Sequence, residues 1–364
     1  MEYKKLEEFL NYIQPTNYIV KSENYSMDYD VPVLTAGQTF LLGYTNEKNG
    51  IYNASKYNPI ILFDDFTTAF KWVDFPFKVK SSACKILIPK KNQNIRYVFY
   101  AMQKVKIDNS LHKRYWISLF SQKEIKNPSL DKQQEIVSIL DKINAIIDAD
   151  KKQLELLDET VKSRFVEMFE NQDFPRYKLC DITYKITDGK HGGCNTVNSS
   201  DFYFVGAREI YDNKINYKTA QFITESEFIK DYKRCNLEIG DFIIVNTGAT
   251  IGKNAIVSDS RATRTLLQKS VAMIKPNKKV LLPIYLKYIY DCHKELYIVD
   301  NSSAQPNLLL SKIKATEISV PPIELQNEFA SFVKQIDESK FNIQQHLNLM
   351  QELLDKKMDE YFGE

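Results

Sequence analysis

The residues of this 364-residue chain with the clearest chemical potential are a glycine turn and a few histidines and cysteines. Residues 248–253 read Gly-Ala-Thr-Ile-Gly-Lys, one residue short of a phosphate-binding loop, and Asn254 stands where Ser or Thr would coordinate magnesium. The four histidines, His112, His191, His293 and His346, are far apart, and none has the spacing to cysteines that a zinc site needs. We expect a strand and turn at residues 248–253 and no metal site.

The motifs of enzymes that act on DNA are also missing. A methyltransferase that modifies amino groups holds the extruded base with an Asn/Asp-Pro-Pro-aromatic loop, but Pro321-Pro322 follows Val320 and precedes Ile323. No Gly-x-Gly-x-x-Gly turn follows a strand, and no nuclease-like acidic cluster stands out. A catalytic triad is defined by geometry, so the sequence leaves that question open. We predict a protein that is not an enzyme and has no catalytic residues.

Charge alternates along the chain. Residues 1–126 carry 18 Lys and Arg against 12 Asp and Glu, and residues 173–319 carry 21 against 16. Residues 127–172 carry 6 against 10, and residues 320–364 carry 4 against 9. Basic residues interleaved with aromatic ones, densest in residues 71–126, suit a surface that follows phosphates, although a solvated lysine-rich face would have the same composition.

A long-period repeat organises the chain. Residues 127–169 match residues 320–362 without a gap: Pro128 falls on Pro321, Gln133 on Gln326, and the last residue, Phe169, on Phe362. Both copies carry apolar residues in steps of three and four, which is typical of a helix in a coiled coil. At 1.5 Å per residue each helix would be roughly 60 Å long. A surface helix lying on each globule is the alternative.

The segments between the helices read as mixed α and β. Strands are expected at residues 60–63, 85–88, 242–245 and 271–274, and short helices at 97–103 and 284–291. The turn after the expected strand at 60–63 corresponds to the turn after the one at 242–245. The two segments, which we call globules, therefore resemble each other. The five scattered cysteines, the charged N-terminus and the lack of an apolar span predict a cytoplasmic protein without a membrane segment.

Several stretches resemble the specificity subunit of type I restriction-modification systems. One is Ser302-Ser303-Ala304-Gln305-Pro306-Asn307-Leu308, followed by Ile318 to Gln326, where a recognition domain would pass into a spacer helix. Others are His112 to Trp116, Pro32 to Gln38, Phe63 to Thr67, and Gly240-Asp241 with Thr247 to Gly252. The resemblance covers nearly the whole chain, although the spacer helices are short.

The resemblance implies an α+β fold with two mixed α/β target-recognition domains separated by two long helices that form an antiparallel coiled coil. The expected boundaries are residues 1–126 and 173–319 for the recognition domains, and 127–172 and 320–364 for the spacer helices. Such a subunit reads a bipartite, asymmetric sequence in double-stranded DNA. It docks two methyltransferase subunits and a restriction subunit that is both translocase and nuclease. The chain itself would carry no cofactor, because S-adenosylmethionine would bind the partner methyltransferase.

Two other interpretations stay open at this point. The chain could be the specificity subunit of a type IIB-like modification assembly, which the neighbouring genes would decide. It could also be a coiled-coil scaffold that does not bind DNA, which predicts no salt-dependent DNA affinity.

We expect DNA contacts in turns that recur in both halves, because their side chains suit base edges and phosphates. An equally simple explanation for any one of these residues is that it caps a turn. The candidates are Gln38, Thr39, Thr67, Thr68, Lys71, Lys113 and Arg114 in the first half, and Lys190, His191, Arg208, Thr247, Thr250, Lys253, Ser303 and Gln305 in the second.

The helix pattern also predicts how the two helices meet. One antiparallel register matches apolar residues along the whole seam, from Ile136 against Leu354 to Val161 against Phe329. It leaves one polar layer, Asp150 opposite Lys340. A polar pair in a coil lowers stability but fixes register.

Overall fold

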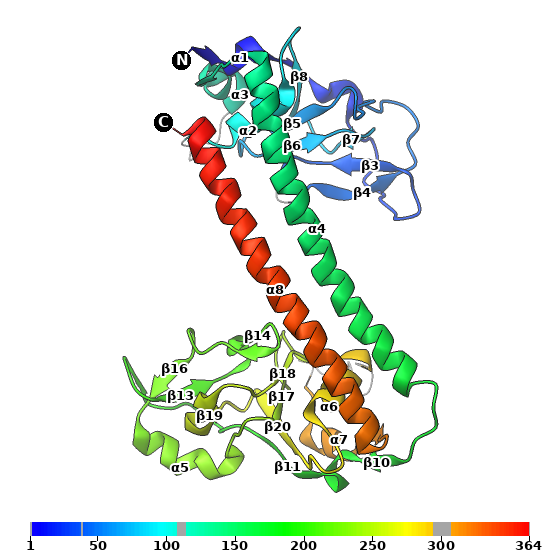
Figure 1. The fold of residues 1–364 in the computed structure, drawn as a ribbon, viewed down its shortest axis with the longest axis vertical. Coiled ribbons are helices and arrows are strands. Elements are labelled where there is room, and N and C mark those ends of the chain that lie inside the picture. The colour runs from blue at the N-terminus through cyan, green and yellow to red at the C-terminus, as the bar shows by residue number, and fades with distance from the viewer. Residues whose placement is uncertain (1, 38, 108–113, 294–306, 364) are drawn as a thin grey trace. The chain divides into compact units, whose positions relative to one another are not determined.

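A computed structural model describes residues 2–37, 39–107, 114–293 and 307–363. The chain divides into two compact units. Unit 1 contains Met1–Lys151 and Gln344–Glu364, and unit 2 contains Lys152–Ile343. The two long helices, α4 (Leu130–Phe169) and α8 (Ile323–Phe362), each contribute residues to both units (Figure 1).

The globule of unit 1 is built on two small sheets. The larger has the order β2-β8-β5-β6 and the smaller the order β4-β3-β7, in which β3 and β7 are parallel (Figure 1). A third pair, β1 with β9, brings Tyr3 opposite Lys126 next to the start of α4. The bounds are β1 Tyr3–Lys5, α1 Leu6–Phe9, β2 Leu10–Ile13, β3 Val31–Leu34, β4 Leu41–Thr45, β5 Ile60–Asp64, β6 Phe70–Val73, β7 Lys78–Val79, β8 Cys84–Pro89, α2 Ile95–Met102, α3 Tyr115–Ser118 and β9 Glu124–Lys126.

The globule of unit 2 repeats this plan with additions. Its larger sheet has the order β11-β20-β17-β18, and the smaller has the order β12-β16-β13-β19, with β13 and β19 parallel. The pair β10 with β21 corresponds to β1 with β9. The bounds are β10 Arg176–Lys178, β11 Thr183–Asp188, β12 Thr196–Val197, β13 Phe202–Val205, β14 Ile210–Tyr211, β15 Lys214–Ile215, β16 Gln221–Ile223, α5 Glu225–Cys235, β17 Phe242–Val245, β18 Asn254–Ile256, β19 Thr265–Leu267, β20 Val271–Pro276, α6 Pro283–Cys292, α7 Leu310–Ala315 and β21 Glu317–Ser319.

The predicted α+β fold class is confirmed, and so are the four expected strands and two short helices. The apolar runs identified them because a strand in the centre of a sheet is buried on both faces: all four residues of β17 are buried, as are the first four of β8 and of β20. Unit 2 differs from unit 1 mainly by β12, β14, β15 and the helix α5.

Both long helices begin just after a proline, and each is anchored by a buried glutamine side chain at the equivalent position. Gln133 and Gln326 are almost fully buried, and each donates from Nε2 to a proline carbonyl at the helix start: Pro128 O at 3.0 Å and Pro321 O at 2.9 Å. Gln326 also accepts from the Leu282 N–H at 2.8 Å. Each amide thus pairs a backbone carbonyl beside the helix start, and Gln326 also pairs the backbone N–H of Leu282.

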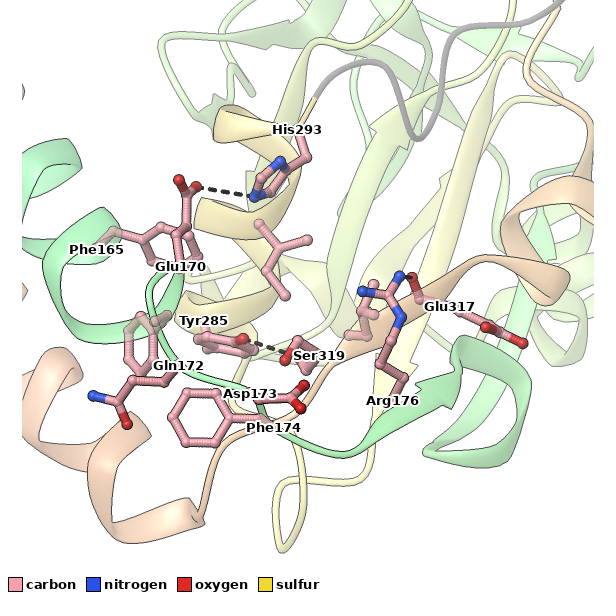
Figure 2. A pocket seen from close by; sticks show the side chains of 13 residues that line it. Phe165, Glu170, Gln172, Asp173, Phe174, Arg176, Tyr285, His293, Glu317 and Ser319 are labelled. Carbon is pink, nitrogen blue, oxygen red and sulfur yellow. Dashed lines mark hydrogen bonds and ion pairs between the residues drawn. The ribbon is translucent and has the colours of Figure 1, made fainter.

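The other end of each long helix is fixed by an aromatic joint. In unit 2, the ring of Phe169 packs on Tyr285 with centroids 4.8 Å apart. Figure 2 shows the Tyr285 hydroxyl, which donates to Ser319 O at 2.9 Å. In unit 1, Phe362 packs on Tyr97 at 5.3 Å, and the Tyr97 hydroxyl donates to Lys126 O at 2.8 Å. The repeat in the sequence therefore corresponds to the same contact between helix end and globule in both units.

A cavity of about 360 Å³ lies beside this joint in unit 2 (Figure 2). Two of its charged side chains are paired: Arg176 donates to Glu317 O at 3.0 Å, and His293 lies 3.0 Å from Glu170. Since the aromatic lining belongs to the connection between helix and globule, the cavity is a feature of the joint.

The helices run antiparallel within each unit, but the predicted Asp150–Lys340 pair is wrong. In unit 2, Lys340 bonds to Asp158 at 2.6 Å. In unit 1, Asp150 bonds to His346 at 2.7 Å, and His346 lies six residues beyond Lys340 on α8. Asp150 is buried, as a polar layer requires, but its partner is different.

Aromatic packing explains the different register. The register predicted from the sequence pairs Phe329 with Val161, whereas the Phe329 ring packs on Phe165 and Phe169, both with centroids 5.5 Å apart. Burying large rings outweighs matching one charge pair, because each buries about 150–250 Å². The seam pattern alone did not include these residues near the helix end.

The Gln326 anchor predicts a clear stability effect. Gln326→Ala should lower the free energy of unfolding by about 2 kcal/mol, because it leaves buried backbone groups without partners. Gln335→Ala, at an exposed position of the same helix, is the matched control and should be nearly neutral. Urea denaturation measures both, and equal stabilities would contradict the anchor.

The revised register predicts a second contrast. His346→Ala should cost about 1–3 kcal/mol, because it leaves the Asp150 carboxylate, whose side chain is 10% exposed, without its partner. Lys340→Ala should cost at most about 1 kcal/mol, since its ion pair with Asp158 is largely solvated. A larger loss for Lys340→Ala in urea denaturation would restore the register predicted from the sequence.

Candidate nucleic-acid interface

In unit 2, three loops that follow strands converge on one cavity. The loops come after β11, β17 and β19, and the cavity has a volume of about 320 Å³. Two predicted residues, Lys190 and Thr247, line it. The other lining residues, which the sequence analysis missed, are Gly192, Gln268, Lys269, Ser270 and Asn307. Hydroxyl, amide and ammonium groups are the types that read base edges and phosphates.

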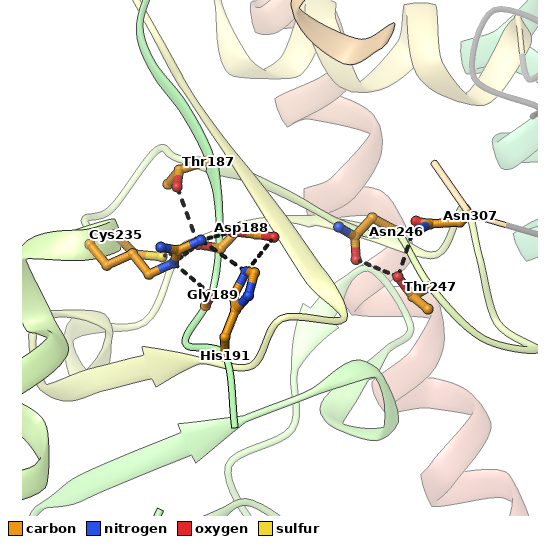
Figure 3. Close-up of polar contacts among 9 residues, drawn as sticks. Thr187, Asp188, Gly189, His191, Cys235, Asn246, Thr247 and Asn307 are labelled. Carbon is orange, nitrogen blue, oxygen red and sulfur yellow. Dashed lines mark hydrogen bonds and ion pairs between the residues drawn. The ribbon is translucent and has the colours of Figure 1, made fainter. Parts of the chain in front are cut away.

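Backbone hydrogen bonds hold these loops together. Lys190 N–H donates to Leu267 O at 2.7 Å, and Lys269 N–H donates to Lys190 O at 3.0 Å. Thr247 Oγ1 donates to Asn307 Oδ1 at 3.2 Å, as Figure 3 shows. The loops therefore form one preorganised surface.

The side chain of Lys190 points into an ion-pair cluster instead of toward solvent. It contacts Glu227 at 3.2 Å and also bonds to Asp231, and only 10% of the side chain is exposed. The hydrogen bond with Asp231 raises the pKa of Lys190. The two carboxylates compensate its charge, so we assign Lys190 a role in holding the loop.

His191 is held by Asp188 and Arg234. Its Nε2 lies 3.1 Å from Asp188 Oδ2 and 3.0 Å from Arg234 Nη2 (Figure 3). Burial opposes ionisation of Asp188, but the hydrogen bonds from Arg234 and His191 outweigh it and lower the pKa of the carboxyl group. Asp188 is therefore a buried anion, and His191 is its exposed neighbour.

The loop between β17 and β18 is a turn in an antiparallel hairpin, as predicted. Val245 N–H donates to Lys253 O at 2.8 Å, and Gly248 and Gly252 adopt left-handed φ angles of 103° and 89°. A phosphate-binding loop would lead into a helix, whereas here strand β18 follows. Thr250 is half-buried, and Lys253 is exposed with Nζ 5.9 Å from the centroid of the Tyr211 ring.

Arg208 is exposed in the short turn after β13. Because β13 and β19 are parallel, their carboxyl ends lie at the same sheet edge, which places Arg208 on the same side as Gln268. Ser303 and Gln305 lie outside the described residues.

In unit 1, the turn between β5 and β6 carries Thr67 and Thr68, and Thr68 has φ 62°. Asp65, at the base of this turn, accepts two backbone hydrogen bonds from α3, each at 2.8 Å. The N–H of Tyr115 donates to Asp65 O, and the N–H of Trp116 donates to Asp65 Oδ1. Exposed Arg114, which directly precedes Tyr115, thus lies near the base of this turn.

The remaining unit 1 candidates differ in their positions in the structure. Thr39 is exposed between β3 and β4. Lys71 lies within β6, paired with Leu62, so its expected position in a turn is wrong: the β5–β6 turn is shorter than the β17–β18 turn with which it was aligned. Gln38 and Lys113 lie outside the described residues.

The described residues contain no cluster of three or more His, Cys, Asp or Glu side chains that could hold a metal ion. Burial raises the pKa of the Cys84, Cys194, Cys235 and Cys292 thiols to about 11, which is unfavourable for a nucleophile. Among the helices of the described residues, none is both long and apolar enough to span a bilayer.

Comparison with known proteins identifies several relatives. The family described as "Type I restriction modification DNA specificity domain" matches residues 1–159 and 178–352. The specificity subunit of the Escherichia coli type I restriction enzymes EcoR124I and EcoR124II is 34% identical, over 80% of this chain and 74% of that protein. The putative type I restriction enzyme MjaX specificity subunit of Methanocaldococcus jannaschii is 27% identical, over 35% of this chain and 31% of that protein.

Two solved structures share the fold. The type I restriction-modification S subunit from M. genitalium has a TM-score of 0.59 at 14% identity, covering 100% of this chain and 96% of that chain. A chain from a structure on complex assembly and conformational transition of the type I R-M system has a TM-score of 0.53 at 14% identity, covering 99% and 97%. At this identity the likeness concerns the fold alone.

Proposed function

Because the chain belongs to the family of type I restriction-modification DNA specificity subunits, we propose that it reads a bipartite, asymmetric DNA sequence, one part with each globule. The observation that carries this proposal is the pair of globules with one sheet plan and different loops. Equal scaffolds place their loops alike, and different side chains in those loops select different bases.

The distribution of charge along the chain also favours DNA binding by the globules. The globules carry the basic excess and the helices are acidic. Lysines and arginines such as Arg114, Arg208 and Lys253 would neutralise phosphates and set the position of each globule on the duplex. Residues such as Thr67, Thr247 and Gln268 would face base edges.

Catalysis would lie in partner subunits, because specificity subunits of this family are recognition subunits without a reaction of their own. We propose that two methyltransferase subunits, which bring S-adenosylmethionine, dock on this chain, and that a restriction subunit with translocase and nuclease activity completes the complex. The chain would act in the cytoplasm, beside the DNA.

The direct test is co-expression with a methyltransferase subunit of the same system, followed by sequencing of methylated DNA. A two-part, non-palindromic methylated sequence is the expected result. Methylation that does not depend on the chain, or a methylated sequence with a single part, would contradict the proposal.

Ion pairing predicts which lysines matter for affinity. Lys253→Ala should reduce the slope of log Kd against log salt by about 0.9, because an exposed phosphate contact is lost. Lys190→Ala should leave the slope nearly unchanged, since Glu227 and Asp231 already compensate its charge. Fluorescence anisotropy with the full chain measures both.

Lys334→Ala on α8 is the control for charge loss at an exposed site away from the loops. An equal slope for Lys253→Ala and the unmodified protein would remove Lys253 from the interface.

Modularity predicts the result of a domain exchange. Replacing residues 1–126 with the equivalent domain of a relative should change one part of the methylated sequence and leave the other part intact. The donor domain should keep a tyrosine at the position of Tyr97, because its ring and hydroxyl hold Phe362 and Lys126. A change in both parts, read by sequencing methylated DNA, would disprove independent readout.

A further inference from the structure

Gln268 stands directly after β19 and lines the cavity of unit 2, and its backbone is fixed on both sides. Its N–H donates to Val205 O at 2.8 Å, at the end of the neighbouring strand β13, and its carbonyl accepts from Val271 N–H at 2.9 Å. On the other side it forms a β-bridge with Lys190 in the loop after β11. The side chain of Gln268 therefore starts from a backbone that neighbouring segments hold in place.

The amide group of Gln268 lies where a side chain of residue 206 would be. A side-chain carbon on Gly206 would be 2.6 Å from Cδ and 3.1 Å from Nε2 of Gln268, and closer still to Oε1. These are the three atoms nearest to that position, and all of them belong to the amide. The missing side chain of Gly206 thus leaves the space that the amide occupies.

The backbone of Gly206 does not itself call for a glycine. Its N–H donates to Oε2 of the buried Glu209 at 2.8 Å, which fixes the turn after β13. Its φ of −117° and ψ of −165° are extended values that are open to other residues. What the structure requires of residue 206 is therefore space for the amide.

The amide is available to an external partner. Within the part of the chain that the structure describes, it has no hydrogen-bond partner, and the side chain is half-buried. A carboxamide carries an acceptor oxygen and N–H donors side by side, whatever the pH, so no tautomer has to be chosen. Gln268 can thus offer one acceptor and one donor at the same time.

Among the major-groove edges, adenine carries the complementary pair. It presents the N6 amino donor beside the N7 acceptor, whereas guanine presents two acceptors. Cytosine presents one donor and thymine one acceptor. An amide therefore pairs with both groups of adenine, and with a single group of any other base.

The equivalent position of unit 1 carries a different side chain. Lys80 N–H donates to Leu34 O at 3.0 Å, as Gln268 N–H donates to Val205 O. Both residues follow a short strand, β7 or β19, that is parallel to its neighbour. An amide at this place in one globule and an ammonium group in the other fit an asymmetric target.

We propose that Gln268 reads an adenine in the half-site of unit 2 and that Gly206 is its positioning residue. Oε1 of Gln268 accepts from the N6 amino group, and Nε2 donates to N7. Gly206 acts through Gln268, by leaving the space in which the amide lies. This inference rests on the proposed function and adds to it the identity of one base pair, A·T, in the target.

The test uses the full chain co-expressed with a methyltransferase subunit of the same system, and methylated DNA is sequenced for each variant. Gln268→Ala should lower discrimination for one A·T pair about 5- to 100-fold, because a bidentate base contact is lost. Gly206→Ala should relax the same pair, because its methyl group displaces the amide. The part of the target read by unit 1 should stay unchanged.

Gly206→Ala separates positioning from stability. The atoms that its methyl group meets are the far end of a flexible side chain, so the thermal midpoint should stay that of the wild-type chain. Gly193→Ala, in the loop after β11, is the matched control, because the same methyl group there meets no atom within 4 Å. It should keep the wild-type sequence.

A binding measurement identifies the atom that is read. 7-Deazaadenine, which lacks the N7 acceptor, replaces each adenine of the half-site in turn, and fluorescence anisotropy follows binding by the complex of chain and methyltransferase. At one position the analogue should weaken binding by the wild-type complex and have no further effect on Gln268→Ala. Equal weakening of both complexes at every position would overturn the contact to N7.

Other results would overturn the inference alone. They are an unchanged methylated sequence in Gln268→Ala, relaxation of a G·C pair instead of an A·T pair, or the wild-type sequence in Gly206→Ala. A lower thermal midpoint with an equal loss at both half-sites in Gly206→Ala would mark a purely structural residue and overturn its positioning role. No methylation with the wild-type chain would instead overturn the proposed function, and this inference with it.

Discussion

Each long helix ends in a phenylalanine that packs on a tyrosine of a globule, and the rest of the structure depends on this contact. The hydroxyl of the same tyrosine, Tyr285 or Tyr97, bonds to the last strand before the other long helix begins. One side chain therefore ties together the end of one helix, the globule and the start of the other helix. Because apolar burial supplies the energy and the hydrogen bond supplies direction, the joint is both stable and specific.

The sequence was a good guide wherever one physical pattern dominated. Central strands such as β17 were predictable because they are continuously apolar, and the long helices because a seam repeats without a gap. The register was not, because Phe165 and Phe169 near the helix end outweigh the charge pairing considered on the seam. The role of Lys190 was also not predictable, since Glu227 and Asp231 lie about forty residues away in sequence and only the fold brings them close to Lys190. Gln268 had one usable signal, its place directly after a short apolar strand.

The two globules show how a scaffold can be kept while its surface changes. The strand orders β2-β8-β5-β6 and β11-β20-β17-β18 correspond strand for strand. The loops at their ends differ in length, and only unit 2 has α5 behind one of them. Core packing constrains the strands, whereas a loop anchored by a few side chains can change without disturbing them.

Unit 1 is assembled from two distant stretches, and this has a consequence for biosynthesis. Met358 belongs to the same apolar cluster as Leu6 and Phe9, and Lys104 bonds to Asp359. Since a ribosome makes these partners hundreds of residues apart, the first globule to emerge is the last to be completed, whereas unit 2 is made from one continuous stretch. Until then the apolar face that receives the end of α8 is open, and a chaperone or a second nascent chain can reach it.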